Sequence, residues 1–156
     1  MKLEIESIVN FITHLINLSK KVEYDIDGYK LYEFSKNLED VLTENYNIKW
    51  DYSDPWNGSN GRILRINEIL DYRIINASLL TNIPPEEVHK RLPIDLIIWV
   101  DPGLVTYRIF DFYFELFDIV KDKSSWVPAV GNEKRKQDLR KNSFCDCKFD
   151  CHHDCI

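Results

Sequence analysis

The first 144 residues of this 156-residue chain contain no cysteine. All four cysteines, Cys145, Cys147, Cys151 and Cys155, lie within the last twelve residues. A secreted domain stabilised by disulfides spreads its cysteines through the fold. The distribution therefore predicts a reducing compartment, the cytoplasm or the nucleus, and leaves the C-terminal cysteines as a separate question.

Long apolar runs and an excess of positive charge are also missing. No stretch approaches the roughly 18 uninterrupted apolar residues of a membrane span. The N-terminus carries Glu4, Glu6 and His14 where a signal peptide would be apolar. With 20 Lys and Arg against 26 Asp and Glu, the net charge is -6. We therefore expect no membrane partner and no direct nucleic-acid contact.

The chain lacks the short motifs of common catalytic classes. It contains no phosphate-binding loop, no dinucleotide-binding glycine pattern, no nucleophile elbow and no paired-histidine zinc motif. The two histidines outside the C-terminal segment, His14 and His89, lie on expected helices, where a structural role is favoured. The many acidic residues are scattered, which is typical of solvated helix faces. The sequence therefore disfavours an enzyme.

The residues that are present suit one folded core. Hydrophobic residues make up 44% of the chain and charged residues 29%, which is ordinary for a globular domain. Apolar residues recur at helical spacing over residues 3–18 and again over 31–42, where Asp27 is suited to cap the second helix. Two such helices joined by a short polar link are expected to pack as an antiparallel pair.

Shorter elements are expected after residue 45. They are a structured loop rich in aromatic residues, Pro and Gly to residue 61, a strand over 62–66, a helix capped by Asp71, a helix opened by Pro84 and Pro85, strands over 96–100 and 104–109 around the turn Asp101-Pro102-Gly103, and a strand from Phe112. This order predicts an α+β fold, with the N-terminal antiparallel helix pair and further short helices packed on a small antiparallel sheet.

The turn after the 96–100 strand contains two candidate functional residues. Asp101 lies between a strand and a proline, where an aspartate typically accepts backbone hydrogen bonds at the turn. An exposed binding role is the alternative for this carboxylate. Trp99 has the periodicity of a core residue, and a surface contact is its alternative. The pattern alone leaves both alternatives open.

Two blocks carry specific landmarks in order and register. Residues 31–67 contain Tyr46, Trp50, Pro55, Gly58, Ser59, Arg62 and Leu64. Residues 92–109 contain Leu92, Pro93, Leu96, Trp99, Asp101, Pro102, Val105 and Tyr107. These blocks and the spacing between them resemble box A and box B of the BTG/Tob antiproliferative family. The resemblance covers residues 1–109 and extends in part to residue 120. The first residues, MKLEIESIVNFI, resemble the Tob side of the family most.

The resemblance implies a BTG-like domain over residues 1–120 that acts as a non-enzymatic adaptor. Family members bind the Caf-type deadenylase subunit of the Ccr-Not complex, promote mRNA deadenylation and restrain proliferation. The box B tryptophan and aspartate that make this contact correspond to Trp99 and Asp101, and Asp71 corresponds to a residue of the same surface. A desolvated tryptophan beside an acceptor carboxylate is a typical interface hot spot. The resemblance implies no resident cofactor.

The chain departs from the family pattern in two places. Gly61 stands where the family has an aromatic residue before the strand arginine, and Trp56 is the candidate to replace that contact. The family's glycine-containing hairpin is replaced by residues 110–113, FDFY, none of which suits a positive-φ turn, so longer or differently paired last strands are expected. These departures motivate an alternative function. In it, the fold is kept but nuclease binding is lost, and the protein acts through self-association or another messenger-ribonucleoprotein or transcriptional partner.

Residues 121–156 are expected to form a disordered basic and Cys/His-rich tail. Its basic run, Lys134, Arg135, Lys136, Arg140 and Lys141, suits nuclear import or simply solubility, and the second interpretation is favoured. Six residues that can bind Zn²⁺ follow it: Cys145, Cys147, Cys151, His152, His153 and Cys155. Their spacing matches no familiar zinc finger. A cluster without a ligand is therefore favoured over zinc binding and over redox reactivity.

Overall fold

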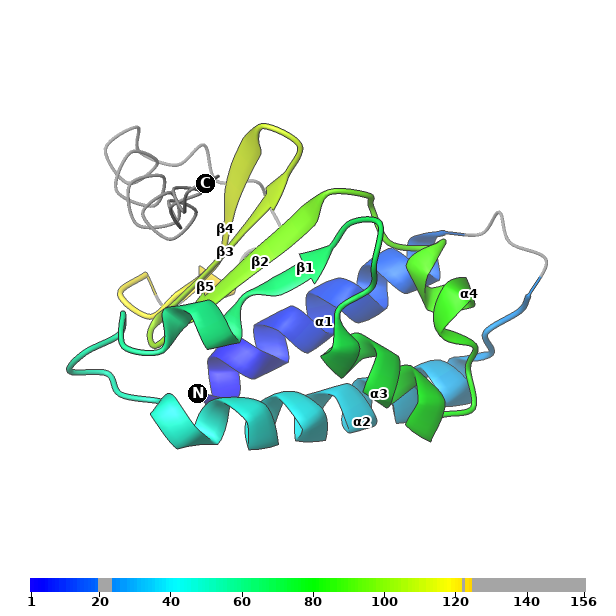
Figure 1. The fold of residues 1–156 in the computed structure, drawn as a ribbon, viewed down its shortest axis with the longest axis horizontal. Helices are drawn as coiled ribbons and strands as arrows, with labels where there is room; N and C mark the ends of the chain where they lie inside the picture. The colour runs from blue at the N-terminus through cyan, green and yellow to red at the C-terminus, as the bar shows by residue number, and fades with distance from the viewer. Residues whose placement is uncertain (20–23, 122, 125–156) are drawn as a thin grey trace, which may run out of the picture.

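The computed structural model describes residues 1–19, 24–121 and 123–124. The basic run and the Cys/His cluster of the predicted tail lie outside these residues. A layer of helices packs against one face of an antiparallel sheet (Figure 1). This architecture confirms the α+β fold predicted from the order of helices and strands.

The two long helices are α1, Lys2–Leu18, and α2, Gly28–Tyr46. They run antiparallel, so that the start of α1 lies beside the end of α2 (Figure 1). Asp27 caps α2 as expected, because its side chain accepts a 2.8 Å hydrogen bond from the Lys30 amide. The buried stripe of α1 includes Ile5, Ile8, Ile12 and Ile16, which are at most 1% exposed.

The shorter elements follow in the expected order. They are the 3₁₀ turns η1 (Asn47–Lys49) and η2 (Ser59–Arg62), the strand β1 (Leu64–Ile66), the helices α3 (Tyr72–Leu80) and α4 (Pro85–His89), and the strands β2 (Leu96–Asp101), β3 (Leu104–Ile109), β4 (Phe112–Asp118) and β5 (Lys123–Ser124). The sheet order is β1-β2-β3-β4-β5, and every neighbouring pair is antiparallel. Each strand therefore pairs with the strand next to it in the chain.

The strand expected over 62–66 is two residues shorter at its start. Arg62 belongs to the η2 turn, and the strand begins at Leu64. The reason is that side chains bind the backbone carbonyls at this point: Tyr46 donates from its hydroxyl to Arg62 O at 3.2 Å, and Arg73 donates to Ile63 O at 2.6 Å. These carbonyls are satisfied without a strand partner.

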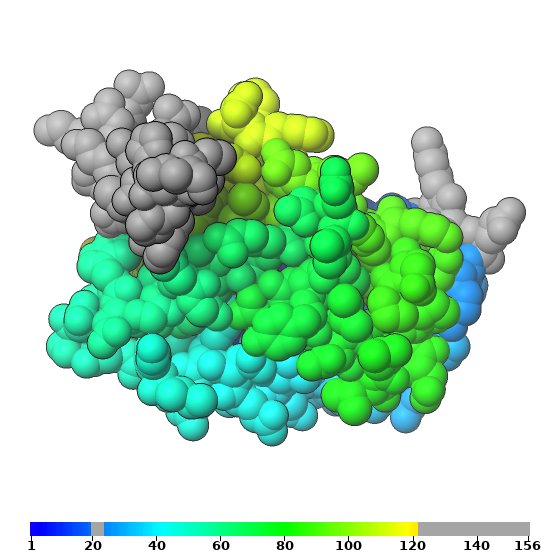
Figure 2. Space-filling view, in the orientation of Figure 1, coloured from blue at the N-terminus to red at the C-terminus, as the bar shows by residue number. Residues whose placement is uncertain are grey.

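The expectation that none of residues 110–113 suits a positive-φ turn is wrong, whereas the longer or differently paired last strands, relative to the family, stay a prediction. Ile109 pairs with Phe112, so β3 and β4 are joined by the two-residue turn Phe110-Asp111. Phe110 adopts φ +52° to make this turn, at a cost of about 1 kcal/mol for a residue other than glycine. The pairing of β3 with β4 on both sides of the turn holds that conformation. Phe110 and Phe112 are 61% and 67% exposed at the hairpin tip, which projects from the body of the molecule (Figure 2).

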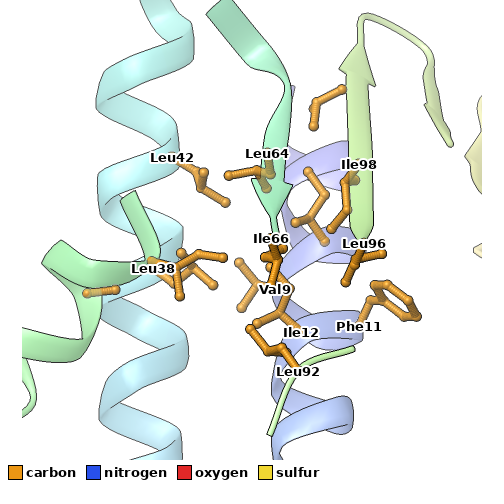
Figure 3. Close-up of a cluster of buried hydrophobic side chains, with 14 of the residues drawn as sticks. Val9, Phe11, Ile12, Leu38, Leu42, Leu64, Ile66, Leu92, Leu96 and Ile98 are labelled. Carbon is orange, nitrogen blue, oxygen red and sulfur yellow. The ribbon is translucent and has the colours of Figure 1, made fainter. Parts of the chain in front are cut away.

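The core lies between the helices and the inner face of the sheet. Leu64 and Ile66 of β1 point toward Val9 and Ile12 of α1, and Leu38 and Leu42 approach from α2 (Figure 3). Leu96 and Ile98 of β2 lie on the same side (Figure 3). Each fully buried side chain of this size contributes about 2 kcal/mol through the area it removes from water.

The opposite face of the sheet carries the alternate side chains. On β2, Leu96, Ile98 and Val100 are buried, whereas Ile97 and Trp99 are only half-buried. Strand alternation makes neighbouring residues point to opposite faces. We call this side of the sheet the outer face, defined by Arg65, Ile97, Trp99, Thr106, Arg108, Tyr113 and Glu115.

Candidate functional site

Trp99 lies on the outer face near the end of β2. Its ring stacks on that of Tyr113 in β4, with 5.8 Å between ring centroids and 22° between ring planes. Trp99 pairs with Thr106 in the sheet, and Tyr113 pairs with Arg108 two residues further along the same strand. The two rings therefore meet diagonally across β3. Of the alternatives left by the sequence, the structure places Trp99 outside the hydrophobic core, half-buried on the outer face.

Asp101 is buried, in contrast to Trp99. Only 4% of the residue is exposed, and its Oδ1 accepts a 3.1 Å hydrogen bond from Arg62 Nη2. Burial raises the pKa of Asp101 above its ordinary value, by more than the hydrogen bonds from Ser59 and Arg62 lower it. Asp101 also pairs with Leu104 at the base of the turn, where Gly103 adopts φ +84°. The structure thus does not expose Trp99 and Asp101 together.

Arg62 connects the end of β2 to the loop of residues 49–57. Its side chain is buried, and all five of its N–H donors are used. The acceptors are Val100 O (2.8 Å from Nε), Lys49 O and Asn57 O (2.9 and 2.8 Å from Nη1), and Pro55 O and Asp101 Oδ1 (2.6 and 3.1 Å from Nη2). We call Arg62, Asp101 and these carbonyls the Arg62 clamp.

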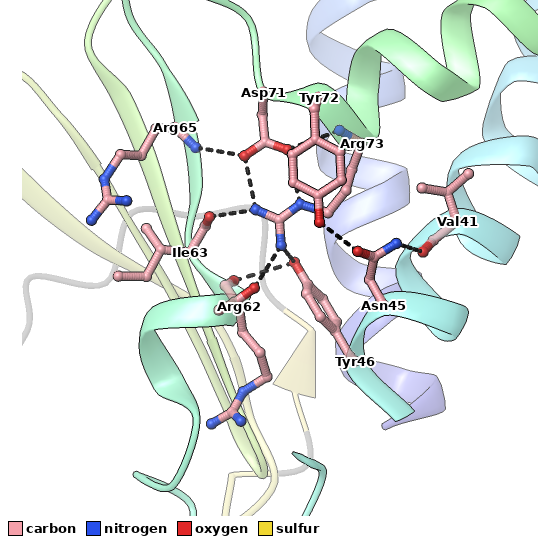
Figure 4. A network of polar contacts seen from close by, with 10 residues as sticks. Val41, Asn45, Tyr46, Arg62, Ile63, Arg65, Asp71, Tyr72 and Arg73 are labelled. Carbon is pink, nitrogen blue, oxygen red and sulfur yellow. Dashed lines mark hydrogen bonds and ion pairs between the residues drawn. The ribbon is translucent and has the colours of Figure 1, made fainter. Parts of the chain in front are cut away.

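Arg73, the second residue of α3, forms a second clamp. Its Nε and Nη2 donate to the two carboxylate oxygens of Asp71, both at 2.8 Å. Its remaining donors reach Gly61 O at 2.9 Å, Ile63 O at 2.6 Å and the Tyr46 hydroxyl at 3.3 Å (Figure 4). We call Arg73, Asp71 and these acceptors the Arg73 clamp. It fixes the start of α3 to the segment before β1.

Asp71 is part of the fold rather than an open surface residue. Its side chain is 8% exposed, and it caps α3 by accepting a 3.0 Å hydrogen bond from the Arg73 amide. A second backbone amide, that of Arg65, donates to Asp71 at 3.4 Å (Figure 4). The predicted cap is confirmed, and the predicted partner contact of Asp71 stays a prediction.

Trp56 lies before the η2 turn, and Gly61 lies within it. Trp56 is 51% exposed, in the loop that Arg62 holds. Gly61 is exposed, and a Cβ built on it meets no atom within 4 Å. The position where the family has an aromatic residue is therefore open to a larger side chain. Trp50, by comparison, packs against the core, and its ring centroid lies 5.6 Å from the Arg62 guanidinium.

Sequence reasoning missed Glu4, which supports the β2–β3 turn from α1. Glu4 is 1% exposed, and its Oε1 accepts 3.0 Å hydrogen bonds from the Gly103 amide and the Tyr52 hydroxyl. Although burial raises the pKa of Glu4, these bonds and the one from the N-terminal amine hold it below its ordinary value. The available signal was the place of Glu4 on the apolar stripe, one helical turn before Ile8.

Two general features of the described part of the chain bear on function. Across residues 1–19, 24–121 and 123–124, no helix is both long and apolar enough to cross a bilayer. In the same ranges, no three His, Cys, Asp or Glu side chains are grouped to hold a metal ion. His89, an expected structural histidine, lies 2.8 Å from Asn67 O through Nε2.

This arrangement of helices, meander sheet and outward tryptophan defines a BTG/Tob-type domain. The solved structure of the FOG-3 BTG/Tob domain of C. elegans matches it in fold, with a TM-score of 0.65 and 23% sequence identity, over 78% of this chain and 95% of that domain. The model of the BTG family matches residues 1–113. The chain belongs to the BTG family, which confirms the resemblance seen in boxes A and B.

Named relatives extend this comparison. The chain is 34% identical to rat protein BTG2 over 106 residues, which span 68% of this chain and 65% of that protein. It is also 34% identical to human Tob1 over 110 residues, which span 70% of this chain and 30% of that protein. The match thus spans less than two thirds of either relative, and identity alone does not separate the BTG side from the Tob side. Proteins of this antiproliferative family are non-enzymatic regulators.

Proposed function

We propose that this protein is a non-enzymatic adaptor that binds the Caf-type deadenylase subunit of the Ccr-Not complex and promotes mRNA deadenylation in the cytoplasm and nucleus. The observation that carries the proposal is Trp99, a large aromatic side chain that lies half-buried on the outer face of a sheet. Burying the remainder of such a ring in a partner contributes about 2 kcal/mol or more at an interface hot spot. Family membership supports the same assignment.

The two predicted aspartates contribute to this function by positioning other groups. Asp101 accepts from Arg62, which in turn holds the carbonyls of the loop that carries Trp56. Asp71 holds Arg73 against the Gly61 carbonyl. Both carboxylates therefore fix the backbone on either side of the contact surface before a partner arrives. A surface that is ordered in advance loses less entropy on binding.

Trp56 supplies the second predicted contact of the adaptor. It is exposed in a loop whose backbone is bound to a buried arginine, so its position is restrained without being covered. Because Gly61 offers no side chain, we propose that Trp56 partly replaces the family's aromatic contact. The affinity for the nuclease is then lower than that of a chain with both aromatic residues.

A binding measurement with the full chain and a purified Caf-type deadenylase tests the proposal. Trp99→Ala is expected to weaken binding by tenfold or more, about 1.4 kcal/mol, in calorimetric titration. The matched control is Tyr29→Ala, which removes a 73% exposed aromatic ring from α2 and is expected to leave affinity unchanged. Thermal unfolding of each variant checks that the fold is intact. No binding by the wild-type chain would rule the function out.

The alternative function is self-association of a domain that has lost nuclease binding. Gly61 and the exposed Phe110 and Phe112 at the hairpin tip favour it. Sedimentation of the full chain separates the two proposals. A wild-type dimer that becomes monomeric in Phe110→Asp, together with no affinity for the nuclease, supports the alternative. A monomer that binds the nuclease excludes it.

A further inference from the structure

Four side chains form one row across the outer face. Arg65 of β1 pairs with Ile97 of β2, Ile97 pairs with Arg108 of β3, and Arg108 pairs with Tyr113 of β4. Residues that pair across antiparallel strands point to the same face. The row therefore reads Arg, Ile, Arg, Tyr from the β1 edge inward, with the two arginines on either side of one apolar side chain.

The next row places the Trp99 ring beside this first row. Trp99 pairs with Thr106, and Thr106 pairs with Glu115. Thr106 is only 5% exposed, although it lies on the outer face, because Trp99 and Tyr113 meet across β3 at this point. The outer face thus carries a stacked aromatic pair beside a row that contains two arginines.

The charge on this face is predominantly positive. Arg65 is exposed, and its side chain forms no ion pair among the described residues. Asp71 binds only the backbone amide of Arg65. Its side chain points away from the Arg73 clamp (Figure 4). Arg108 is bound only at 3.3 Å to Asp95, and its buried Nε has no hydrogen-bond partner among the described residues. Glu115, the acidic side chain of the second row, is paired with Lys121 at 2.7 Å.

We propose that the outer face docks an acidic and apolar segment of a partner protein. A carboxylate of that segment binds between Arg65 and Arg108 above Ile97, and an apolar side chain covers the Trp99–Tyr113 pair. Paired strands lie roughly 4.8 Å apart, so the Cα atoms of the two arginines are about 10 Å apart, a distance that two long side chains close around one carboxylate.

This inference rests on the proposed function, because Trp99 belongs both to the proposed nuclease contact and to the docking surface on the outer face. It adds Arg65, Arg108 and Tyr113 to the contact and shifts its centre. A side chain at residue 61 would lie at the η2 turn, beside the end of β2, whereas Tyr113 reaches Trp99 from β4. Tyr113 therefore supplies the aromatic surface that Gly61 does not, on the other side of Trp99.

Arginines beside aromatic rings are also the chemistry that binds single-stranded RNA. The charge of this chain favours a protein partner instead. The net charge is -6, which opposes a polyanion at long range, and Asp95 and Glu115 lie next to the row. The Trp99 ring also stacks on Tyr113 rather than standing free for a base. A single carboxylate needs only the two local guanidinium groups.

Substitutions in the full chain test the surface with the purified Caf-type deadenylase. Arg65→Glu and Tyr113→Ala are each expected to weaken binding by about tenfold, and Tyr113→Phe, which keeps the ring, is expected to retain it. The matched controls are Lys36→Glu, at a 56% exposed lysine of α2, and Tyr29→Ala on the same helix. Both controls are expected to bind like the wild type. If Arg65→Glu and Tyr113→Ala also bind like the wild type, the inference is overturned while the proposed function stands.

A second probe keeps the inference testable if the nuclease does not bind at all. The probe is a synthetic peptide that alternates Glu with Phe, compared with the same peptide carrying Gln in place of Glu. We expect the acidic peptide alone to shift the Trp99 indole N–H signal in NMR spectra, and Arg65→Glu to abolish the shift. No shift with either peptide overturns the inference. Oligo(A) RNA that shifts the same signal, with the same dependence on Arg65, overturns the assignment to a protein partner.

Discussion

Arg62 and Arg73 are chemically alike but hold different parts of the molecule. Each is buried, uses all five donors and pairs with one aspartate. The aspartate of Arg73 is two residues away in the chain, whereas that of Arg62 is 39 residues away. The Arg73 clamp therefore joins adjacent elements of the core, and the Arg62 clamp joins a surface loop to the β2–β3 hairpin. The comparison separates a residue that supports the fold from one that supports the site.

The largest effect is expected from breaking the Arg73 clamp. Arg73→Met leaves the buried Asp71 carboxylate without its cation and removes donors from three other oxygens. Loss of one partner of a buried ion pair costs about 3–5 kcal/mol. Urea unfolding monitored by far-ultraviolet circular dichroism measures this loss. A cost below about 1 kcal/mol would show that the clamp does not support the core.

A smaller loss of stability is expected from Arg62→Lys, with a larger effect on the site. Lysine keeps the charge beside Asp101 but cannot reach carbonyls in three directions at once. We expect a cost of about 1–3 kcal/mol and faster hydrogen exchange confined to residues 49–58, together with weaker nuclease binding. The matched comparison is Arg73→Lys, for which exchange should rise in α3 instead. Equal exchange in both variants would remove the distinction between the two clamps.

The pH dependence of stability sharpens the comparison at the Arg62 clamp. Because burial raises the pKa of Asp101, the native state binds this proton more tightly than the unfolded state does. Its contribution is fully present below the ordinary pKa of 3.8 and is lost as the pH rises through the native pKa. The free energy of unfolding of the wild type, relative to Asp101→Asn, should therefore fall as the pH rises through that window. Urea unfolding of both proteins at several pH values measures this difference in the free energy of unfolding. A difference that increased with pH would contradict the prediction.

The smallest change in stability is expected at Gly61, which contributes only its backbone carbonyl to the Arg73 clamp. The open space around its Cβ position means that Gly61→Tyr adds an exposed ring without a clash. We expect unfolding free energy to change by less than about 0.5 kcal/mol and affinity for the deadenylase to rise several-fold. Gly61→Ser is the control for the loss of glycine itself. Unchanged affinity in Gly61→Tyr would show that the missing aromatic residue does not limit binding.

Most of the fold could be predicted from the sequence, but the two clamps could not. Local patterns and family features are visible in the sequence, and the structure and the family match confirm them. They are the helix periodicity, the caps Asp27 and Asp71, and the landmarks of boxes A and B. Arg73, two residues after a cap, looks like an ordinary solvated helix residue. Its burial depends on carbonyls of residues 61 and 63, which only the tertiary fold brings near.

The candidate site shows the same limit. The alternation along β2 leaves open which face of the sheet Trp99 lies on. Only the packing of other elements against the sheet decides this. Tyr113 meets Trp99 only because the β3–β4 turn has two residues, and FDFY carries no turn signal that predicts this length. Arg62 alternates correctly for a strand, so its place in a 3₁₀ turn was hidden by an apparently regular pattern.

The meander order of the sheet has a consequence for how the chain folds. The β2–β3 and β3–β4 hairpins close through turns of two residues each, whereas β1 must find β2 across an intervening segment of 29 residues that contains α3 and α4. Local contacts form first, since closing a longer loop costs more entropy. We expect the Arg62 clamp, which bridges that segment, to form after the folding transition state. Substitutions there should then accelerate unfolding and leave the folding rate nearly unchanged.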